Sequence, residues 1–447
     1  MLIIKKIKIS YTEIIVFGTL VIILSGALLL SLPISSKSGI VTPFIDSLFT
    51  SASAFCVTGL IAYDTFTHWS LFGQLIILLL IQIGGLGFMT VITLFSMFLR
   101  RKIGLKERRL LMESANTLKI GGIVMLVKKI IIGTFLFESM GALILTLNFY
   151  PEMGFKEGLF YGIFHSVSAF CNAGFDLMGK YGQFSSLTAY SNNFVVNATV
   201  MTLIVSGGIG FVVWDDIISS HACFRKFQLH TKIVLVTTTA LILASSLLFF
   251  VIEADHSMAD MSMGERMLAS VFQSVTPRTA GFNTINMNEM SEGGNLLTII
   301  LMIIGGSPGS TAGGIKTTTF ITLLAGAWAS AGQSSDISIF KRRLETDTLK
   351  KASAITVIYM SIALIAIILI STIQEFPLKE IMFEVFSALG TVGLSLGITP
   401  SLNALSKIII ALLMYGGKVG VLSIAAVVAE KKEPALLSRP HEKIIIG

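Results

Sequence analysis

The chain has 447 residues, of which 53 % are hydrophobic and only 13 % charged, and its mean hydropathy is +0.82. Such a composition cannot cover a water-facing surface with polar groups, which excludes an ordinary soluble globular protein and indicates an integral membrane protein. The formal net charge of +7 does not indicate nucleic-acid binding, because the basic clusters lack accompanying stacking aromatics.

Apolar runs long enough to cross a membrane, about 20 helical residues each, are the main elements predicted along the chain. The eight runs are 13–34, 70–99, 123–149, 194–219, 230–252, 295–328, 352–374 and 402–429. Lys and Arg gather before the first run and after the second, fourth and sixth, whereas the alternate connections carry mostly Asp and Glu. By the positive-inside rule both termini are therefore expected in the cytoplasm. No A-x-A-like cleavage site follows the first run, so it is expected to be a helix and not a signal peptide.

A short phrase recurs between these runs. Its copies are "SAFCVTGL" (53–60), "SAFCNAGF" (168–175), "VTPRTAGF" (275–282) and "SALGTVGL" (387–394), and each carries a glycine followed by Leu or Phe. These glycines recur at intervals of 107 to 115 residues, with two apolar runs in each interval. The chain is therefore predicted to consist of four similar units, 1–121, 122–229, 230–350 and 351–447, the third with a broken inner helix and the fourth with a C-terminal tail.

A short amphiphilic segment precedes each phrase, as in "PFIDSLFTSASAF" (43–55) and "EGLFYGIFHSVSAF" (157–170). As a helix, such a segment spans only about half a bilayer, so it is expected to enter from outside and stop near the midplane. The predicted fold class is an all-α integral membrane protein with eight transmembrane helices. Its four M1-P-M2 repeats (helix, re-entrant pore half-helix and loop, helix) surround a central pore.

The phrase itself is small and polar, which suits a special backbone conformation. Non-helical backbone at membrane depth is tolerated only where protein buries it or where it lines a watery cavity. If alternate residues take opposite-handed conformations, which glycine permits, successive carbonyl oxygens can turn toward one axis and replace the hydration shell of a cation. The predicted filter residues are Cys56, Val57, Thr58, Gly59, Cys171, Asn172, Ala173, Gly174, Arg278, Thr279, Ala280, Gly281, Gly390, Thr391, Val392 and Gly393.

At these motifs the sequence resembles the Trk/Ktr/HKT superfamily of potassium transporters, and most closely the KtrB/KtrD type of membrane subunit of bacterial Ktr systems. The resemblance also rests on "QIGGLGF" (82–88), "TPRTAGFN" (276–283) and "GGSPGSTAGGIKTTTF" (305–320), and it covers essentially the whole chain. It implies a multi-pass subunit of a potassium uptake system in the bacterial plasma membrane, and not an enzyme. It further implies a homodimer under the control of a cytoplasmic nucleotide-binding ring of the KtrA/KtrC type. K⁺ is the implied transported ion and Na⁺ a candidate activator, with no bound organic cofactor.

The third inner run is interrupted by "GGSPGSTAGGIK" (305–316), whose glycines and proline disfavour a continuous helix. By similarity this is an intramembrane loop that lies under the filter and gates it. The predicted gate residues are Gly305, Gly306, Ser307, Pro308, Gly309, Ser310, Thr311, Ala312, Gly313, Gly314 and Lys316. Ile315 occupies the position where a Walker-type phosphate loop needs glycine, which argues against nucleotide binding here.

Lys418 is the predicted partner of this loop, at a position where the family more often has Arg. Snorkelling of Lys418 to the inner interface is the alternative.

Double glycines in the inner runs, such as Gly84-Gly85 and Gly207-Gly208, are equally well explained by close helix packing. Arg278 could line the pore, but a structural role that points away from the axis is favoured, because a cation beside a cation path would repel the substrate. His165 is expected to be a packed helix residue and not a metal ligand.

Glycine in all four phrases favours potassium, because serine at the position of Gly59 accompanies sodium permeation in some plant members of the superfamily. Asp64, Asp176 and Glu289 could concentrate cations at the outer mouth, although solvated loops explain them as well. A Na⁺-permeable or Na⁺-coupled transporter with alternating access remains the alternative function. Its inverted repeats are not expected here, because each unit has an even number of spans. The three cysteines, Cys56, Cys171 and Cys223, are expected to be free thiols.

Overall fold

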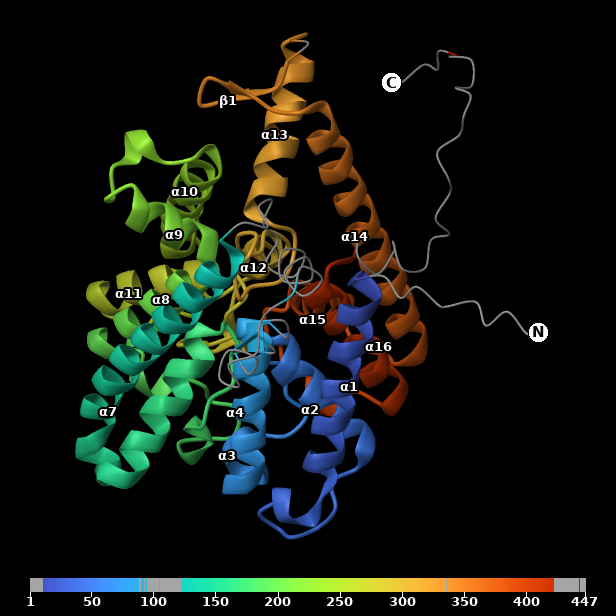
Figure 1. Cartoon of the computed structure of the whole chain (residues 1–447). Coiled ribbons are helices and arrows are strands. Elements are labelled where there is room, and N and C mark those ends of the chain that lie inside the picture. Colours follow the sequence, from blue (N-terminus) through green and yellow to red (C-terminus); the bar gives the residue numbers. More distant parts are fainter. Residues whose placement is uncertain are drawn as a thin grey trace.

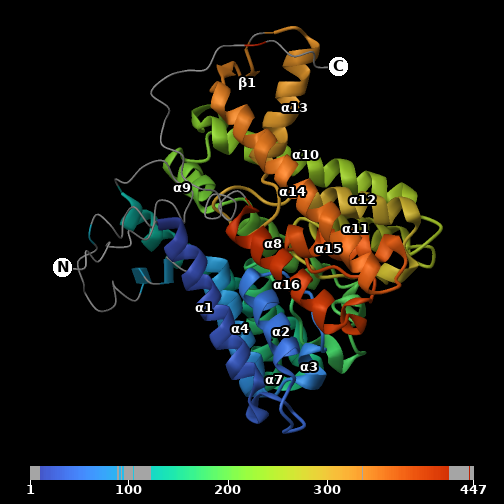
Figure 2. The ribbon, with the colours of Figure 1, turned by 90° about the vertical axis from the view of Figure 1, so that its right-hand side faces the viewer.

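Most of the described part of the chain is helical. A computed structural model describes residues 11–87, 90–91, 93–94, 104, 122–334, 336–421 and 442. The predicted basic connection 100–119, apart from residue 104, and the C-terminal tail beyond 421, apart from residue 442, lie outside the described residues. Figures 1 and 2 show a bundle of helices with a narrow tip formed by the end of α13 and the β1 hairpin.

Four long apolar helices are α1 (Tyr11–Ser31), α7 (Ile123–Phe170), α10 (Leu229–Ile252) and α14 (Thr346–Ile373). Within the described residues, these are the helices that are individually long and apolar enough to cross a membrane. Each exposes large apolar side chains, for example Leu28 (62 %), Leu247 (65 %) and Ile368 (62 %). Exposed apolar faces of this length need hydrocarbon around them, as the composition indicates.

Four shorter, buried helical segments lead into the phrases. They are α2 (Phe44–Cys56), the last part of α7, α11 (Met263–Val275) and α15 (Leu378–Gly390). Within α7, Gly154 has a φ of 76° and a ψ of 172°, so the helix is kinked there and its last part takes a new direction. The short helix predicted before each phrase is therefore present in all four places.

Four further helices follow the phrases: α4 (Leu71–Leu86), α8 (Phe194–Gly208), α12 (Glu292–Ile303) and α16 (Ala404–Val419). Each begins at a polar cap whose side-chain oxygen accepts a hydrogen bond from the backbone N–H three residues later. The caps are Ser70 (3.3 Å), Asn193 (3.1 Å), Ser291 (2.9 Å) and Asn403 (2.8 Å). This shared way of starting a helix reflects the internal repetition of the sequence.

The predicted apolar run 194–219 is helical but not straight. The structure breaks it into α8 and α9 (Phe211–Ser219), which meet at an angle of 92°. Gly210, with a φ of 96°, makes the turn, and the Phe211 N–H donates to Gly309 O (2.9 Å) instead of continuing the helix. The helical hydrogen-bond ladder is thus interrupted by a contact with a distant part of the chain.

The predicted break in the run 295–328 is confirmed. The chain leaves α12 at Ile303 and becomes helical again in α13 (Thr317–Ala331). A two-stranded antiparallel hairpin of β1 (Ser338–Ile339) and β2 (Arg342–Arg343) then leads to α14, with Ser338 opposite Arg343. The connections also contain the single-turn helices α3 (Thr65–His68), Pro33–Ser35, Met178–Lys180, Thr188–Tyr190, Phe224–Lys226, Met287–Glu289 and Thr399–Ser401.

Candidate functional site

The glycines of the four phrases meet in one closed ring. A Cβ atom added to Gly59 would lie 2.6 Å from Ala173 O, and one added to Gly174 would lie 2.7 Å from Ala280 O. A Cβ on Gly281 would lie 2.5 Å from Val392 O, and one on Gly393 would overlap Thr58 O, which closes the circle. Gly59, Gly174, Gly281 and Gly393 are called the glycine ring below. The carbonyl oxygen before each glycine therefore faces the ring glycine of the preceding unit, and the one before Gly59 faces Gly393.

The backbone of every phrase alternates in handedness, as the sequence predicts. The residue two before each glycine has a positive φ: Val57 (58°), Asn172 (60°), Thr279 (70°) and Thr391 (52°). The glycines have φ values of 96°, 69°, 82° and 93°. The residue directly before each glycine does not have a positive φ. Three of the four left-handed residues are β-branched, for which this conformation costs about 1–3 kcal/mol each. Strain repeated at equivalent places indicates that the surrounding structure enforces this backbone shape.

The helices before the phrases end in a way that produces this shape. After α2, Thr58 N donates to Ser53 O (2.8 Å) and Val57 N to Ala54 O (3.2 Å), and the left-handed residue Val57 directly follows the helix. The same pair of bonds follows the last part of α7 and α15. This is the Schellman arrangement, which normally uses glycine at the left-handed position. The C-terminal ends of these helices, which carry partial negative charge, thus lie directly at the phrases.

Four hydroxyl groups form hydrogen bonds to the main chain of the phrases, and they were not among the predicted site residues. Ser53 Oγ accepts from Gly59 N (3.1 Å) and Ser387 Oγ accepts from Gly393 N (3.0 Å). In the other two units, Ser168 Oγ donates to Phe175 O (2.6 Å) and Thr276 Oγ1 donates to Phe282 O (2.5 Å). The recurrence of a hydroxyl residue five or six positions before each glycine is the sequence signal that could have found them.

Two buried side chains at equivalent positions brace the segments that follow the phrases. Nine residues before its ring glycine, His165 Nε2 accepts from Leu177 N (3.3 Å). At the matching position of the fourth unit, Glu384 accepts from Ser395 Oγ (2.8 Å) and Thr399 Oγ1 (2.5 Å). His165 is thus packed within the protein as expected, whereas the role of Glu384 was not predicted.

The double glycines allow close approach of the helices to the phrases. A Cβ on Gly84 would overlap Phe55 O, one on Gly207 would overlap Phe170 O, and one on Gly417 would overlap Leu389 O. Each of these carbonyl groups lies four residues before a ring glycine. Close packing, the plain explanation, therefore accounts for these three glycines.

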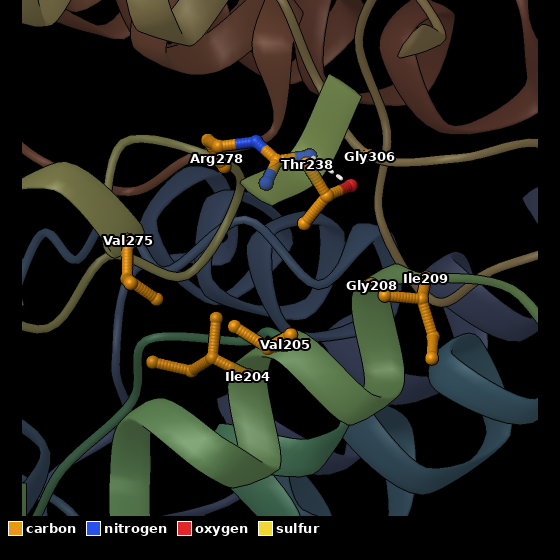
Figure 3. A pocket seen from close by; sticks show the side chains of 8 residues that line it. All are labelled: Ile204, Val205, Gly208, Ile209, Thr238, Val275, Arg278 and Gly306. Carbon is orange, nitrogen blue, oxygen red and sulfur yellow. Dashed lines mark hydrogen bonds between the residues drawn. The ribbon is translucent and has the colours of Figure 1, made fainter. Parts of the chain in front are cut away.

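Arg278 belongs to the third phrase, but its side chain extends toward α10. Arg278 Nη2 donates to Thr238 Oγ1 (3.3 Å), and the residue is only 8 % exposed. Figure 3 shows both side chains beside a small pocket that Ile204, Val205, Val275 and Gly306 also line. No carboxylate in the described ranges lies within ion-pair distance of Arg278.

The segment 305–316 is bound to the break between α8 and α9. Ser307 N donates to Gly208 O (3.0 Å) and Thr311 N to Gly207 O (3.3 Å). It also touches two phrases: Thr311 Oγ1 lies 3.3 Å from the Asn172 side-chain amide, and a Cβ on Gly313 would overlap the side chain of Thr391. The segment therefore lies against the phrases of the second and fourth units.

Two lysines hold the carbonyl groups of this segment. Lys418 Nζ, from the last turn of α16, donates to Thr311 O (2.7 Å). Lys316 Nζ donates to Ala312 O (2.5 Å) and Gly313 O (3.2 Å). Since Lys418 reaches the segment directly, its position in the structure is that of the predicted partner and not of a snorkelling side chain.

The three acids predicted near the outer mouth all bind neighbouring groups. Asp64 accepts from Thr67 N (2.8 Å) and Phe184 N (3.0 Å), which joins the connections of the first two units. Asp176 accepts from Met178 N (2.9 Å) and Glu289 from Asn286 Nδ2 (2.7 Å). Their contacts are those of ordinary loop residues.

Long apolar outer helices around a ring of strained main-chain segments are the features of a helical membrane protein. The sequence matches the TrkH family of cation transport proteins over residues 5–437, so the chain belongs to this family.

Several curated proteins are similar over nearly the full length. The potassium/sodium uptake protein NtpJ of Enterococcus hirae is 39 % identical over an alignment of 447 positions, which covers 98 % of this chain and 98 % of NtpJ. The Ktr system potassium uptake protein B of Bacillus subtilis is also 39 % identical, over 100 % of this chain and 98 % of that protein. The Ktr system potassium uptake protein D of Bacillus subtilis is 35 % identical over 94 % of both. The crystal structure of the potassium transporter TrkH from Vibrio parahaemolyticus has the same fold. Its TM-score is 0.77 at 16 % identity, and the match covers 95 % of this chain and 86 % of that one.

Proposed function

We propose that the chain is the ion-translocating membrane subunit of a potassium uptake system, and that K⁺ passes through the centre of the glycine ring. The closed glycine ring is the observation that supports this proposal. Four main-chain segments meet there with carbonyl oxygens between them, and each segment follows the negative end of a helix. The names of the full-length relatives, which are potassium uptake proteins, agree with it.

In this proposal the four phrases form the filter, whose main-chain oxygens replace the water around the ion. The hydroxyl groups of Ser53, Ser168, Thr276 and Ser387 keep the oxygens in place. Arg278 takes no part in ion contact, because its guanidinium group bonds Thr238 on α10.

The segment 305–316 acts as the gate below the filter, and Lys418 holds it closed through Thr311 O. Movement of the segment would release its bonds to Gly207 and Gly208 at the bend between α8 and α9. The bend would therefore lose these contacts when the segment moves.

The same proposal includes the architecture around the filter. The four units 1–121, 122–229, 230–350 and 351–447 are M1-P-M2 repeats, and eight spans place both termini in the cytoplasm of a bacterial cell. Among the described residues, four helices are long and apolar enough to cross a membrane, or five if the bent pair α8–α9 counts as one span. In this proposal the other spans therefore consist of shorter helical pieces. The subunit works as a homodimer with a cytoplasmic ring of nucleotide-binding subunits.

A Na⁺-permeable or Na⁺-coupled transporter is the second candidate function. The name of NtpJ, a potassium/sodium uptake protein that is 39 % identical to this chain, favours it. The two candidates differ in the flux that each ion supports.

Reconstituted liposomes separate these functions. The purified chain is expected to carry rubidium-86 inward, and external K⁺ is expected to compete with it much more strongly than Na⁺. Equal competition by Na⁺, or uptake that requires Na⁺ at every K⁺ concentration, would support the second candidate. Absence of flux from folded protein, with or without the regulatory ring, would contradict both.

A further inference from the structure

A groove of about 490 Å³ lies between α13 and the β1–β2 hairpin, at the tip of the molecule in Figures 1 and 2. Its apolar lining comes from Leu324 and Trp328 of α13 and from Ile339 and Phe340 of the hairpin. Trp328 is 84 % exposed, Leu324 51 % and Phe340 46 %. Large apolar side chains so exposed indicate that another molecule covers this groove.

The position of Trp328 along α13 sets the depth of this side chain in the membrane. The helix begins directly after Lys316, at the end of the segment that contacts the phrases, and the proposed function places this segment near the membrane midplane. Trp328 lies twelve residues further on, about 18 Å at 1.5 Å per residue. Half of the hydrocarbon core is about 15 Å thick. In the proposed arrangement Trp328 thus lies where the core meets the headgroups, the level at which tryptophan is enriched in membrane proteins.

The hairpin turn next to the groove is strained. Its two central residues, Phe340 (φ 51°) and Lys341 (φ 61°), are both left-handed, as in a type I′ turn. Such turns normally use Asn-Gly or Asp-Gly, because other side chains resist this conformation. The strain sets an aromatic ring and an ammonium group side by side at the rim of the groove, which points to a binding role.

The surface beside the groove is positively charged. Lys341 and Arg342 are exposed, and within the described ranges no carboxylate forms an ion pair with either. Phe340 also contacts Phe224 (6.5 Å between ring centroids), which brings the exposed cations Arg225 and Lys226 to the same side. Unpaired cations at headgroup depth attract an anion, and the anion that carries an apolar chain at this depth is an anionic phospholipid.

We propose that this groove binds an anionic phospholipid of the cytoplasmic leaflet, with an acyl chain against Leu324, Trp328 and Phe340 and the phosphate at Lys341 and Arg342. The orientation rests on the proposed function, which puts this tip of the molecule on the cytoplasmic side. Lipid bound here touches α13, which continues from the gate segment, so its binding would bias the position of that segment.

Fluorescence quenching of Trp328 tests the proposal. The chain has three tryptophans, and Trp69 is fully buried, so the difference between the wild type and Trp328→Phe reports the exposed one. In nanodiscs, brominated-chain phosphatidylglycerol is expected to quench Trp328 more than brominated-chain phosphatidylcholine at equal mole fraction. In Lys341→Gln/Arg342→Gln this preference is expected to fall by about fivefold for each cation removed.

Lys128→Gln/Lys129→Gln removes two exposed cations from α7 and is expected to keep the preference. Equal quenching by both lipids in the wild type, or a preference that survives in Lys341→Gln/Arg342→Gln, would overturn the proposal. Absence of quenching by either lipid would also overturn it and would assign the groove to a protein partner. Rubidium flux in matched liposomes tests the proposed function separately, because the quenching does not depend on ion movement.

Discussion

Lys418 Nζ donates a 2.7 Å hydrogen bond to the main-chain oxygen of Thr311, across 107 residues of sequence. It thereby joins the last turn of α16 to the segment that lies against the phrases of the second and fourth units. A hydrogen bond from a charged donor contributes about 1.5–3 kcal/mol, which is enough to decide the balance between two positions of a loop.

Lys418→Gln is expected to raise the basal rubidium flux of the purified chain by roughly tenfold or more, because Thr311 O loses its charged donor. Lys418→Arg is expected to stay near the wild-type rate, since the guanidinium group can still donate. Lys379→Gln removes an exposed cation that pairs with Glu292 and serves as the control. Unchanged flux in Lys418→Gln would contradict a closing role of this bond.

Gly59→Ser is expected to lower the preference for potassium over sodium. The added Cβ would lie 2.6 Å from Ala173 O and would push one main-chain oxygen out of the ring. Gly397→Ser is the matched control, because Gly397 has nearly the same φ (95° against 96°) but no atom within 4 Å of an added Cβ. Competition of Na⁺ and K⁺ against rubidium uptake measures the effect. A similar loss of preference in both variants would assign it to backbone strain and not to the ring.

Gly207→Ala is expected to destabilise the protein and to abolish most flux. Its Cβ would overlap Phe170 O, a backbone atom at the end of α7 and within the second phrase, which cannot move without distorting the phrase. The neighbouring Gly208→Ala meets only the Asn172 side chain at 3.4 Å and is expected to be tolerated. Thermal unfolding in detergent and rubidium flux compare the two. Equal stability of both variants would show that the close approach of Gly207 to Phe170 O does not affect the free energy of unfolding.

Asp46 and Lys407 form a buried ion pair between α2 and α16, 2.7 Å long, with both side chains 11 % exposed. The second oxygen of Asp46 accepts from Tyr63 Oη (3.0 Å), so the carboxylate is well satisfied. Removal of one partner leaves a buried charge, which costs about 3–5 kcal/mol. Asp46→Asn and Lys407→Met are each expected to lower the unfolding temperature clearly, whereas the double variant is expected to recover part of the loss. Additive losses in the double variant would contradict a direct interaction.

Much of the fold could be predicted because its signals are local. The apolar runs, the recurring phrase and the short helix before it depend on composition and on nearest neighbours. The alternating backbone of the phrases followed from glycine positions, and the break before Lys316 followed from its glycines and proline. The bend at Gly210 was missed because hydropathy does not distinguish a straight run from a bent one. It depends on a hydrogen bond between Phe211 and Gly309, 98 residues apart.

The sequence by itself determined that this chain lies in a membrane, that it repeats a phrase four times, and which residues carry that phrase. The sequence also predicted a shared axis of the phrases, an Arg278 that points away from it, and Lys418 as the partner of the segment 305–316. Only the tertiary structure decided the contacts themselves: the order in which Gly59, Gly174, Gly281 and Gly393 meet, the bond of Arg278 to Thr238, and the bond of Lys418 to Thr311. Backbone preference and hydrophobicity act over a few residues, whereas each of these contacts joins atoms that are far apart in the chain and meet only after all helices have packed.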